Sequence, residues 1–296
     1  MRRRKALLIV NASSRNGATL GEEAAERLHA HGIEPVLREC NQREALSPLI
    51  VEAGRDVDLV AVGGGDGTMN AAAAGVIERK LPLGILPMGT ANDLARTLDI
   101  PDHLEAAVGI IAGGHTRRID LGLVNDQPFF NVASIGLSAE LAQRLTRDIK
   151  RRFGRLGYAF VALKVLAQAK PFRATIMAET GSVQVKTLQI AVGNGRYYGG
   201  GNAIEKTAAI DDQHLDLYSL EVARAWKLAL MARSFRTGEH GAWNEVRAIR
   251  AQEFHVTTRK PRSVNADGEI VTSTPAHFRI KPDAVTVFTP EPNTEK

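Results

Sequence analysis

Up to Asn125, two patterns of apolar and polar positions alternate along the chain. Short runs of leucine and β-branched residues, bounded by turn residues, indicate buried strands, and apolar positions at helical spacing between them indicate helices. The expected strands are 5–10, 33–39, 57–62 and 83–86, and the expected helices are 19–31, 43–54, 69–79, 91–98 and 103–113. Strands that alternate with helices in this way predict a parallel sheet with helices on both of its faces.

Beyond Asn125 strand-like runs become dominant. We expect helices at 136–148, 155–169 and 225–236, and strands at 172–179, 183–192, 214–220, 253–258, 276–281 and 284–288. Many strands joined by long connections predict an antiparallel, sandwich-like domain. The turn-rich sequence Asn125-Asp126-Gln127-Pro128 marks the boundary. The pattern therefore predicts an α/β domain over 1–127 and a β-sandwich domain over 128–296, whose last strand could return to the first domain.

Composition and charge restrict the possible classes of function but do not identify one. The chain has 296 residues, of which 44% are hydrophobic and 24% charged, enough for two packed domains. The net charge of +5 suits an anionic partner such as a nucleotide or a lipid surface, but it is too small to single one out, and we expect no nucleic-acid partner. The single cysteine, Cys40, favours a reducing, cytosolic location. No apolar stretch approaches the ~20 residues that span a bilayer, so any lipid would be met from the surface.

A glycine-rich loop, Gly63-Gly64-Gly65-Asp66-Gly67-Thr68, follows a buried strand and precedes a helix expected to begin at Met69. Ligands of parallel sheets bind outside the carboxyl ends of strands. Glycines let backbone amides approach a phosphate, and a helix start adds N–H donors. The spacing is neither the dinucleotide fingerprint nor the Walker pattern. A tight turn is the alternative, but three successive glycines exceed what such a turn needs.

A second turn, within Leu86–Arg96, also joins a strand to a helix. Gly89 permits close approach of the backbone, while Thr90 and Asn92 are natural helix caps or ligands. An ordinary capped helix is the alternative. Two such turns on neighbouring strands would face the same crevice, which favours a binding site.

Together, Gly63–Thr68 and Gly89–Asp93 resemble the diacylglycerol kinase catalytic domain, and most closely its bacterial branch of soluble lipid kinases. Sphingosine and ceramide kinases share these motifs, and NAD kinase and 6-phosphofructokinase use a related loop. The resemblance covers nearly the whole chain. It extends to Phe130–Gly136, Val192–Gly195 with Gly199–Gly201, and Asn265–Glu269.

The resemblance implies a nucleotide-binding domain like that of NAD kinase and phosphofructokinase, a C-terminal β-sandwich and catalysis in the cleft between them. Glu269 would be the general base, with Asp267 beside it; a hairpin turn is the alternative for this Asp-Gly pair. A magnesium site would take a carboxylate from Asp212 and carbonyl oxygens from Ala209 and His214. The residues expected to hold ATP are Glu39, Gly63, Gly64, Gly65, Asp66, Gly67, Thr68, Met69, Asn70, Ala71, Thr90 and Asn92.

Three positions depart from the family pattern. Ala12 replaces the usual proline after the first strand, Ala71 replaces a glutamate, and His214 replaces a small or apolar residue. The first two weaken details of nucleotide contact. The third leaves a carbonyl ligand intact, because carbonyl donation does not depend on the side chain.

These residues suit phosphoryl transfer, which needs positioning, charge neutralisation and deprotonation of the acceptor. The glycine loop would hold the phosphates, and Mg²⁺ would neutralise developing charge, with Asp66, and Asp93 or Asp120, in its outer network. Glu269 would accept the proton of a lipid hydroxyl. The acceptor could be diacylglycerol, phosphatidylglycerol or a long-chain base. A soluble-metabolite kinase of the NAD kinase type and a non-catalytic nucleotide sensor remain alternatives, and only Ala71 favours the sensor.

A basic cluster could bring the protein transiently to the inner face of the membrane. Its cationic residues are interspersed with Leu145, Ile149, Phe153 and Leu156, a composition that could dock on anionic headgroups. A solvated helix face explains the same pattern equally well. The oligomeric state stays open. The cluster consists of Arg144, Arg147, Lys150, Arg151, Arg152 and Arg155.

Overall fold

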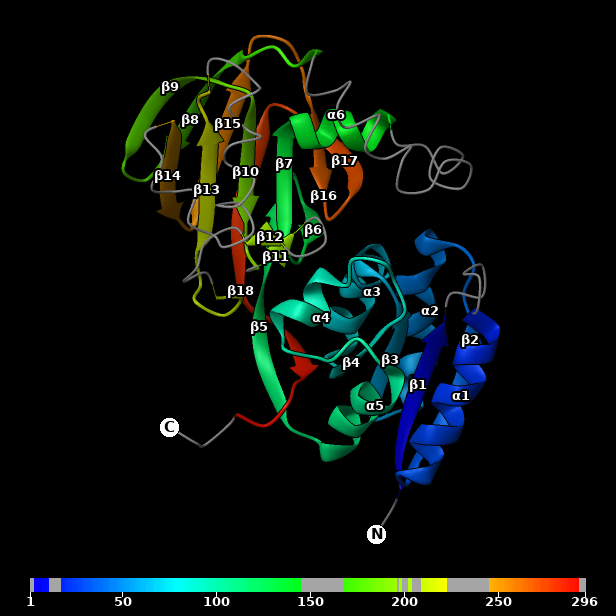
Figure 1. Cartoon of the computed structure of the whole chain (residues 1–296). Coiled ribbons are helices and arrows are strands. Elements are labelled where there is room, and N and C mark those ends of the chain that lie inside the picture. Colours follow the sequence, from blue (N-terminus) through cyan, green and yellow to red (C-terminus); the bar gives the residue numbers. More distant parts are fainter. Residues whose placement is uncertain are drawn as a thin grey trace. The chain divides into compact units, whose positions relative to one another are not determined.

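The computed structural model describes residues 3–10, 17–144, 168–195, 197–198, 202–203, 209–222 and 245–292 (Figure 1). The chain forms two compact units, one of Met1–Leu121 with Pro282–Lys296 and the other of Gly122–Lys281. Two strands, β5 (Thr116–Val124) and β18 (Ala276–Phe288), contribute residues to both units. The sequence predicts a domain boundary at 127. The division between the two units falls inside β5, so that this strand belongs partly to each unit.

The first unit is built on a parallel sheet with the strand order β2-β1-β3-β4-β18. Strand β1 lies between two neighbours, so that Leu7 pairs with Val36 on one side and Val60 on the other. Helices α1 and α5 contact each other, and α2 packs on α3. The bounds are β1 Arg4–Val10, α1 Gly17–Ala30, β2 Ile33–Glu39, α2 Leu46–Ala53, β3 Leu59–Gly64, α3 Asp66–Arg79, β4 Leu83–Pro87, α4 Asp93–Thr97 and α5 Leu104–Gly113.

This architecture confirms the predicted α/β domain with a parallel sheet. Residues 6–10 of β1 and every residue of β3 are buried, as expected for strands that are covered on both faces. One helix differs from the prediction. Helix α3 begins at Asp66 rather than Met69, because Gly65 is its N-cap and the Gly65 carbonyl already accepts the amides of Thr68 and Met69.

Among its described residues, the second unit contains the two-stranded sheet β11-β12 and two larger sheets. One has the order β14-β13-β10-β7-β16-β17, and the other contains the first half of β18 with β15, β8 and β9, all antiparallel, while β5 pairs with β18 and β6. The bounds are β6 Gln127–Phe129, β7 Val132–Gly136, α6 Leu137–Arg144, β8 Phe172–Ala178, β9 Gly181–Thr187, β10 Gln189–Gly193, β11 Tyr197–Tyr198, β12 Asn202–Ala203, β13 Leu215–Leu220, β14 Val246–Ala251, β15 Glu253–Thr258, β16 Ser263–Ala266 and β17 Glu269–Ser273.

The predicted antiparallel sandwich is confirmed by the core of this unit. Phe172, Phe254 and Phe278 of one sheet pack in the same buried cluster as Ile135 and Leu217 of the other. Because both sheets contribute to one apolar layer, they face each other in the way that defines a sandwich.

Some elements differ from the prediction. The expected strand 183–192 is two strands, β9 and β10, which belong to different sheets, and the expected strands 276–281 and 284–288 are one, β18, which runs through Pro282. The expected helices 155–169 and 225–236 lie outside the described residues, apart from the end of the first. Within the part of the chain that is described, no helix combines the length and apolar character needed to cross a bilayer.

Candidate active site: two glycine turns and an acidic hairpin

The two glycine turns of the first unit lie against each other. Strands β3 and β4 are parallel neighbours, with Gly63 opposite Leu86 and Gly64 opposite Pro87, so both turns leave the same edge of the sheet. A Cβ atom on Gly89 would lie 2.5 Å from Gly65 Cα. The backbones therefore approach as closely as two glycines allow.

The first two glycines of the loop are explained by packing. A Cβ on Gly63 would lie 2.7 Å from the sulfur of Met88, and one on Gly64 would lie 2.5 Å from the side chain of Thr68. Both residues are buried. The tight-turn interpretation accounts for these two positions, and a phosphate would be met by the residues that follow them.

The start of α3 offers a small set of backbone donors. The amides of Thr68 and Met69 donate to the Gly65 carbonyl at 2.8 and 3.1 Å. The amides of Asp66 and Gly67 come first in the helix and have no helical carbonyl one turn back to bind. These two N–H groups, at the positive end of a 14-residue helix, are the donors best placed for an anion.

Asp66 and Asn92 hold the two turns in shape. The Leu94 amide donates to Asp66 Oδ1 at 2.9 Å, which ties the first turn of α4 to the first turn of α3. Asn92 has a φ of 50°, and its Oδ1 accepts the Gly89 amide at 2.9 Å. Asn92 also donates to Asp102 at 2.7 Å. Asp66 thus joins the two turns through one carboxylate oxygen, whereas Asn92 braces its own turn and links it to Asp102.

The remaining residues expected to hold ATP occupy different environments. Thr90 is exposed in the second turn, and Glu39 is exposed at the carboxyl end of β2. Asn70 Oδ1 is buried and accepts no hydrogen bond from the described residues. The Ala71 carbonyl accepts the hydroxyl of Ser47 at 2.7 Å, which joins α3 to α2.

The two further acids considered for the magnesium network are committed to contacts within the chain. Asp93 is buried and its carboxylate pairs with Arg96 at 3.0 Å. Asp120 is also buried and accepts the Asp283 amide at 2.8 Å. Both carboxylates therefore stabilise the fold of the first unit where they stand.

Arg43 is a candidate phosphate ligand that sequence reasoning missed. A Cβ on Gly67 would lie 2.9 Å from Arg43 Nη1, so the guanidinium lies against the first turn of α3. A signal was present in the sequence, because Arg43 closely follows the expected strand 33–39 and lies near the carboxyl edge of the sheet. Guanidinium groups bind phosphate with two parallel hydrogen bonds.

The acidic motif of the second unit is a tight hairpin between β16 and β17. Asp267 and Gly268 have φ values of 45° and 96°, and Glu269 is the first, exposed residue of β17. The Asp267 carboxylate accepts backbone amides from Phe130 at 2.7 Å and from Asn131 and Val132 at 3.0 Å each. Asp267 therefore fixes the hairpin, and Glu269 is the acid that the hairpin presents.

Three sequence motifs from distant parts of the chain meet at this hairpin. Asn265 Oδ1 accepts the Gly268 amide at 3.1 Å, and the Asn194 side chain donates to the Phe130 carbonyl at 2.8 Å. The amides of Asn194 and Gly195 donate to the Asn131 carbonyl. The segments Phe130–Gly136, Val192–Gly195 and Asn265–Glu269 thus form one polar network around the base of the turn.

We expect Asp267→Ala to destabilise the second unit by roughly 2 kcal/mol or more, since it leaves three amides without their charged acceptor. Urea unfolding followed by fluorescence measures the change. The matched control is Asp211→Ala, which removes an exposed aspartate from another turn of the same unit. Equal unfolding midpoints for the two variants would show that the network does not stabilise the second unit.

The expected magnesium ligands lie in a turn before β13. Asp212 Oδ1 accepts the His214 amide at 3.1 Å, and Asp212 Oδ2 is 2.7 Å from Arg250 Nη2. Both carboxylate oxygens therefore already have partners, and one partner is a cation. The set of Ala209, Asp212 and His214 stays a prediction, and an ion at this set would compete with Arg250 for the carboxylate of Asp212.

Replacing Arg250 with alanine is expected to strengthen binding of Mg²⁺ or Mn²⁺ at Asp212 by up to about fivefold, because an exposed ion pair contributes up to about 1 kcal/mol. Calorimetric titration of both proteins with Mn²⁺ measures the change. Arg247→Ala, on the same strand but paired with Glu221, is the control. An unchanged affinity in Arg250→Ala would remove Asp212 from the set of metal ligands.

The basic residues of 144–155 and the glycines 199–201 lie outside the described residues, apart from Arg144 at the end of α6. Their expected roles stay predictions.

Comparisons with known proteins give consistent results for both domains of the chain. Residues 5–124 match the model of the diacylglycerol kinase catalytic domain, and residues 131–289 match that of the YegS C-terminal NAD kinase beta sandwich-like domain. A "Probable lipid kinase YegS-like" of Klebsiella pneumoniae is 31% identical over 94% of both chains. A "Diacylglycerol kinase" of Staphylococcus epidermidis is 28% identical over 80% of this chain and 75% of its own.

A solved structure has the same fold. It is described as "a putative diacylglycerol kinase from Bacillus anthracis str. Sterne", superposes with a TM-score of 0.83 at 26% identity, and covers 98% of this chain and 97% of its own. Both domain models, the two relatives and the solved structure all indicate the same family. The chain belongs to the diacylglycerol kinase family, in the branch that carries a YegS-type C-terminal domain.

Proposed function

We propose that this chain is a kinase that transfers the γ-phosphate of ATP, with Mg²⁺, to a hydroxyl group of a membrane lipid. The observation that carries the proposal is the pair of glycine turns, Gly65 against Gly89, at the carboxyl edge of a parallel sheet. Ligands of such sheets bind at this edge, and the N-terminus of α3 supplies the backbone donors that phosphate needs.

The residues divide the work of phosphoryl transfer between them. The amides of Asp66 and Gly67 and the guanidinium of Arg43 would bind the phosphate oxygens. Magnesium, when bound with the nucleotide, would supply positive charge to those oxygens, with Asp66 holding it directly or through water. Glu269 would accept the proton of the acceptor hydroxyl, and Asp267 would keep the turn that carries Glu269 in place.

A lipid acceptor is favoured by the relatives. Proteins that share both domains carry names such as lipid kinase and diacylglycerol kinase. Diacylglycerol, phosphatidylglycerol and long-chain bases each present a hydroxyl that this chemistry could phosphorylate. A soluble acceptor is the competing proposal, supported by the likeness of the second domain to that of NAD kinase.

The test is transfer of labelled phosphate from ATP to a panel of lipids in mixed micelles, with and without Mg²⁺, beside soluble acceptors including NAD. We expect labelled lipid that depends on Mg²⁺ and on the micelle. Transfer to soluble acceptors alone would overturn the lipid assignment, and ATP binding without any transfer would indicate a nucleotide sensor.

Arg43→Ala is expected to raise the KM for ATP by about tenfold or more, since a hydrogen bond to a charged group contributes about 1.5–3 kcal/mol and 1.36 kcal/mol is tenfold. Initial rates against ATP concentration measure the effect. Arg55→Ala removes an exposed arginine beyond the far end of α2 and serves as the control. A KM that matches this control would show that Arg43 does not bind phosphate.

A further inference from the structure

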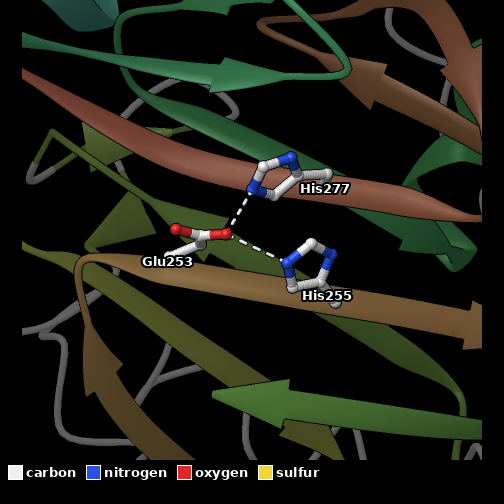
Figure 2. Close-up of side chains that lie close together, drawn as sticks. All are labelled: Glu253, His255 and His277. Carbon is white, nitrogen blue, oxygen red and sulfur yellow. Dashed lines mark hydrogen bonds and ion pairs between the residues drawn. The ribbon is translucent and has the colours of Figure 1, made fainter. Parts of the chain in front are cut away.

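A second group of ligating side chains, separate in sequence from the glycine turns and the acidic motif, lies on strands β15 and β18 of the second unit. Glu253, His255 and His277 each offer one metal-ligating atom, and these three atoms lie within 4.8 Å of one another (Figure 2). No other group of this kind occurs among the described residues. The proposed kinase reaction does not use any of the three.

Strand alternation explains why these side chains share a face. His255 pairs with His277 across the antiparallel strands, and Phe254 pairs with Phe278 one position along. Both phenylalanines are fully buried in the sandwich core. Since successive residues point to opposite faces of a sheet, the histidines and Glu253 project from the outer face together.

The three ligand atoms converge on one place. Glu253 Oε1 lies 3.0 Å from His255 Nε2 and 2.6 Å from His277 Nε2. The imidazole rings are stacked, with centroids 4.2 Å apart and an interplanar angle of 13°. Figure 2 shows both rings turning their Nε2 atoms toward the carboxylate.

The charges around the cluster leave the carboxylate available. Arg279, the cross-strand neighbour of Glu253, pairs with Asp126 instead. All three side chains are between 36% and 49% exposed, which leaves room for water to complete a coordination shell.

We propose that Glu253, His255 and His277 form a binding site for a divalent transition-metal ion of the zinc class. Two imidazoles and one carboxylate with a water molecule are a ligand set that Zn²⁺ takes in proteins, at about 2.0–2.2 Å from each protein atom. The ion would lie between the Glu253 carboxylate and the Nε2 atoms of the two histidines, in place of the two hydrogen bonds. Each histidine would then carry its proton on Nδ1 and offer the Nε2 lone pair.

The ligand chemistry separates this site from magnesium binding. Mg²⁺ prefers oxygen ligands, whereas imidazole nitrogen favours Zn²⁺, Ni²⁺ and Cu²⁺. The set at Asp212 offers oxygen atoms only. The cluster on β15 and β18 therefore selects a different ion, and its occupancy is independent of the kinase proposal.

The test is calorimetric titration of the metal-free full-length protein with Zn²⁺, in the presence of excess Mg²⁺. We expect stoichiometric Zn²⁺ binding, a loss of at least tenfold in affinity in His255→Gln and in His277→Gln, and a smaller loss in Glu253→Gln. His31→Gln, which changes an exposed histidine next to α1, is the matched control. Urea unfolding of each variant confirms that the sandwich is intact.

Cobalt provides a second measurement. The Co²⁺-loaded wild-type protein should show the intense visible absorption of a four-coordinate site, and this absorption should disappear in the His255→Gln, His277→Gln double variant. Zn²⁺ affinity that is equal in the wild type and the double variant would overturn the proposal, as would the absence of binding to the wild-type protein.

Discussion

Replacing Glu269 with glutamine is expected to lower kcat by about 10²–10⁴-fold, the usual contribution of a general base, with little change in the KM for ATP. Glutamine keeps the size and shape of the side chain but cannot accept the proton of the acceptor hydroxyl. Because Glu269 is exposed and the hairpin is held by Asp267 and Asn265, the substitution should leave stability unchanged.

The measurement is the rate of labelled phosphate transfer to lipid at saturating ATP. Glu179→Gln, an exposed glutamate in the turn between β8 and β9, is the matched control in the same unit. Full turnover by the Glu269 variant would remove this residue from its proposed role while leaving the nucleotide site untouched.

The second large effect is expected from Gly89→Ala. Its Cβ would lie 2.5 Å from Gly65 Cα and 2.6 Å from Asn92 Oδ1. The first is a backbone atom and the second belongs to a buried side chain, so neither can move cheaply. The two turns must separate, which should cost about 1–3 kcal/mol of stability and weaken ATP binding by tenfold or more.

Calorimetric titration with ATP and thermal unfolding together measure this change. Gly109→Ala is the control, because a Cβ at this position of α5 meets nothing within 4 Å, and alanine in a helix is up to about 1 kcal/mol more favourable than glycine. Native ATP affinity in Gly89→Ala would mean that the close approach of the turns does not shape the nucleotide site.

The first unit could be predicted well because its strands carry a local signal. Strands β1, β3 and β4 are compact apolar runs that are buried over most of their length, and a helix separates each strand from the next. The start of α3 was predicted wrongly because Gly65 and Gly67 do not favour a helix. In the structure, Gly65 caps the helix and Gly67 lies within its first turn.

The second unit was harder because its strands depend on distant partners. The prediction missed strands β5, β6, β7, β11, β12, β14, β16 and β17, because the stability of a strand depends on cross-strand packing that the local sequence does not show. Proline at position 282 suggested a break in a strand that continues. The three-amide contact of Asp267 joins residues more than a hundred positions apart, and no local pattern could show it.

The roles of the candidate site residues stay predictions, and the structure shows where the described ones lie. The sequence named the glycine turns and the acidic hairpin together with the residues around them. It could not distinguish Gly63 and Gly64, which packing requires, from Asp66 and Gly67, whose amides are the proposed phosphate donors. It also could not place Arg43 beside Gly67 or Arg250 on Asp212, because both arrangements arise from tertiary packing.

The last strand has a consequence for biosynthesis. Residue Val287 of β18 pairs with Leu83 of β4, so the parallel sheet takes a strand from residues that are synthesised long after β4. Until those residues leave the ribosome, the nascent sheet carries an uncovered edge at β4, and exposed edges invite pairing with other chains. During synthesis, this uncovered edge is therefore the part of the nascent sheet at which we expect aggregation to begin.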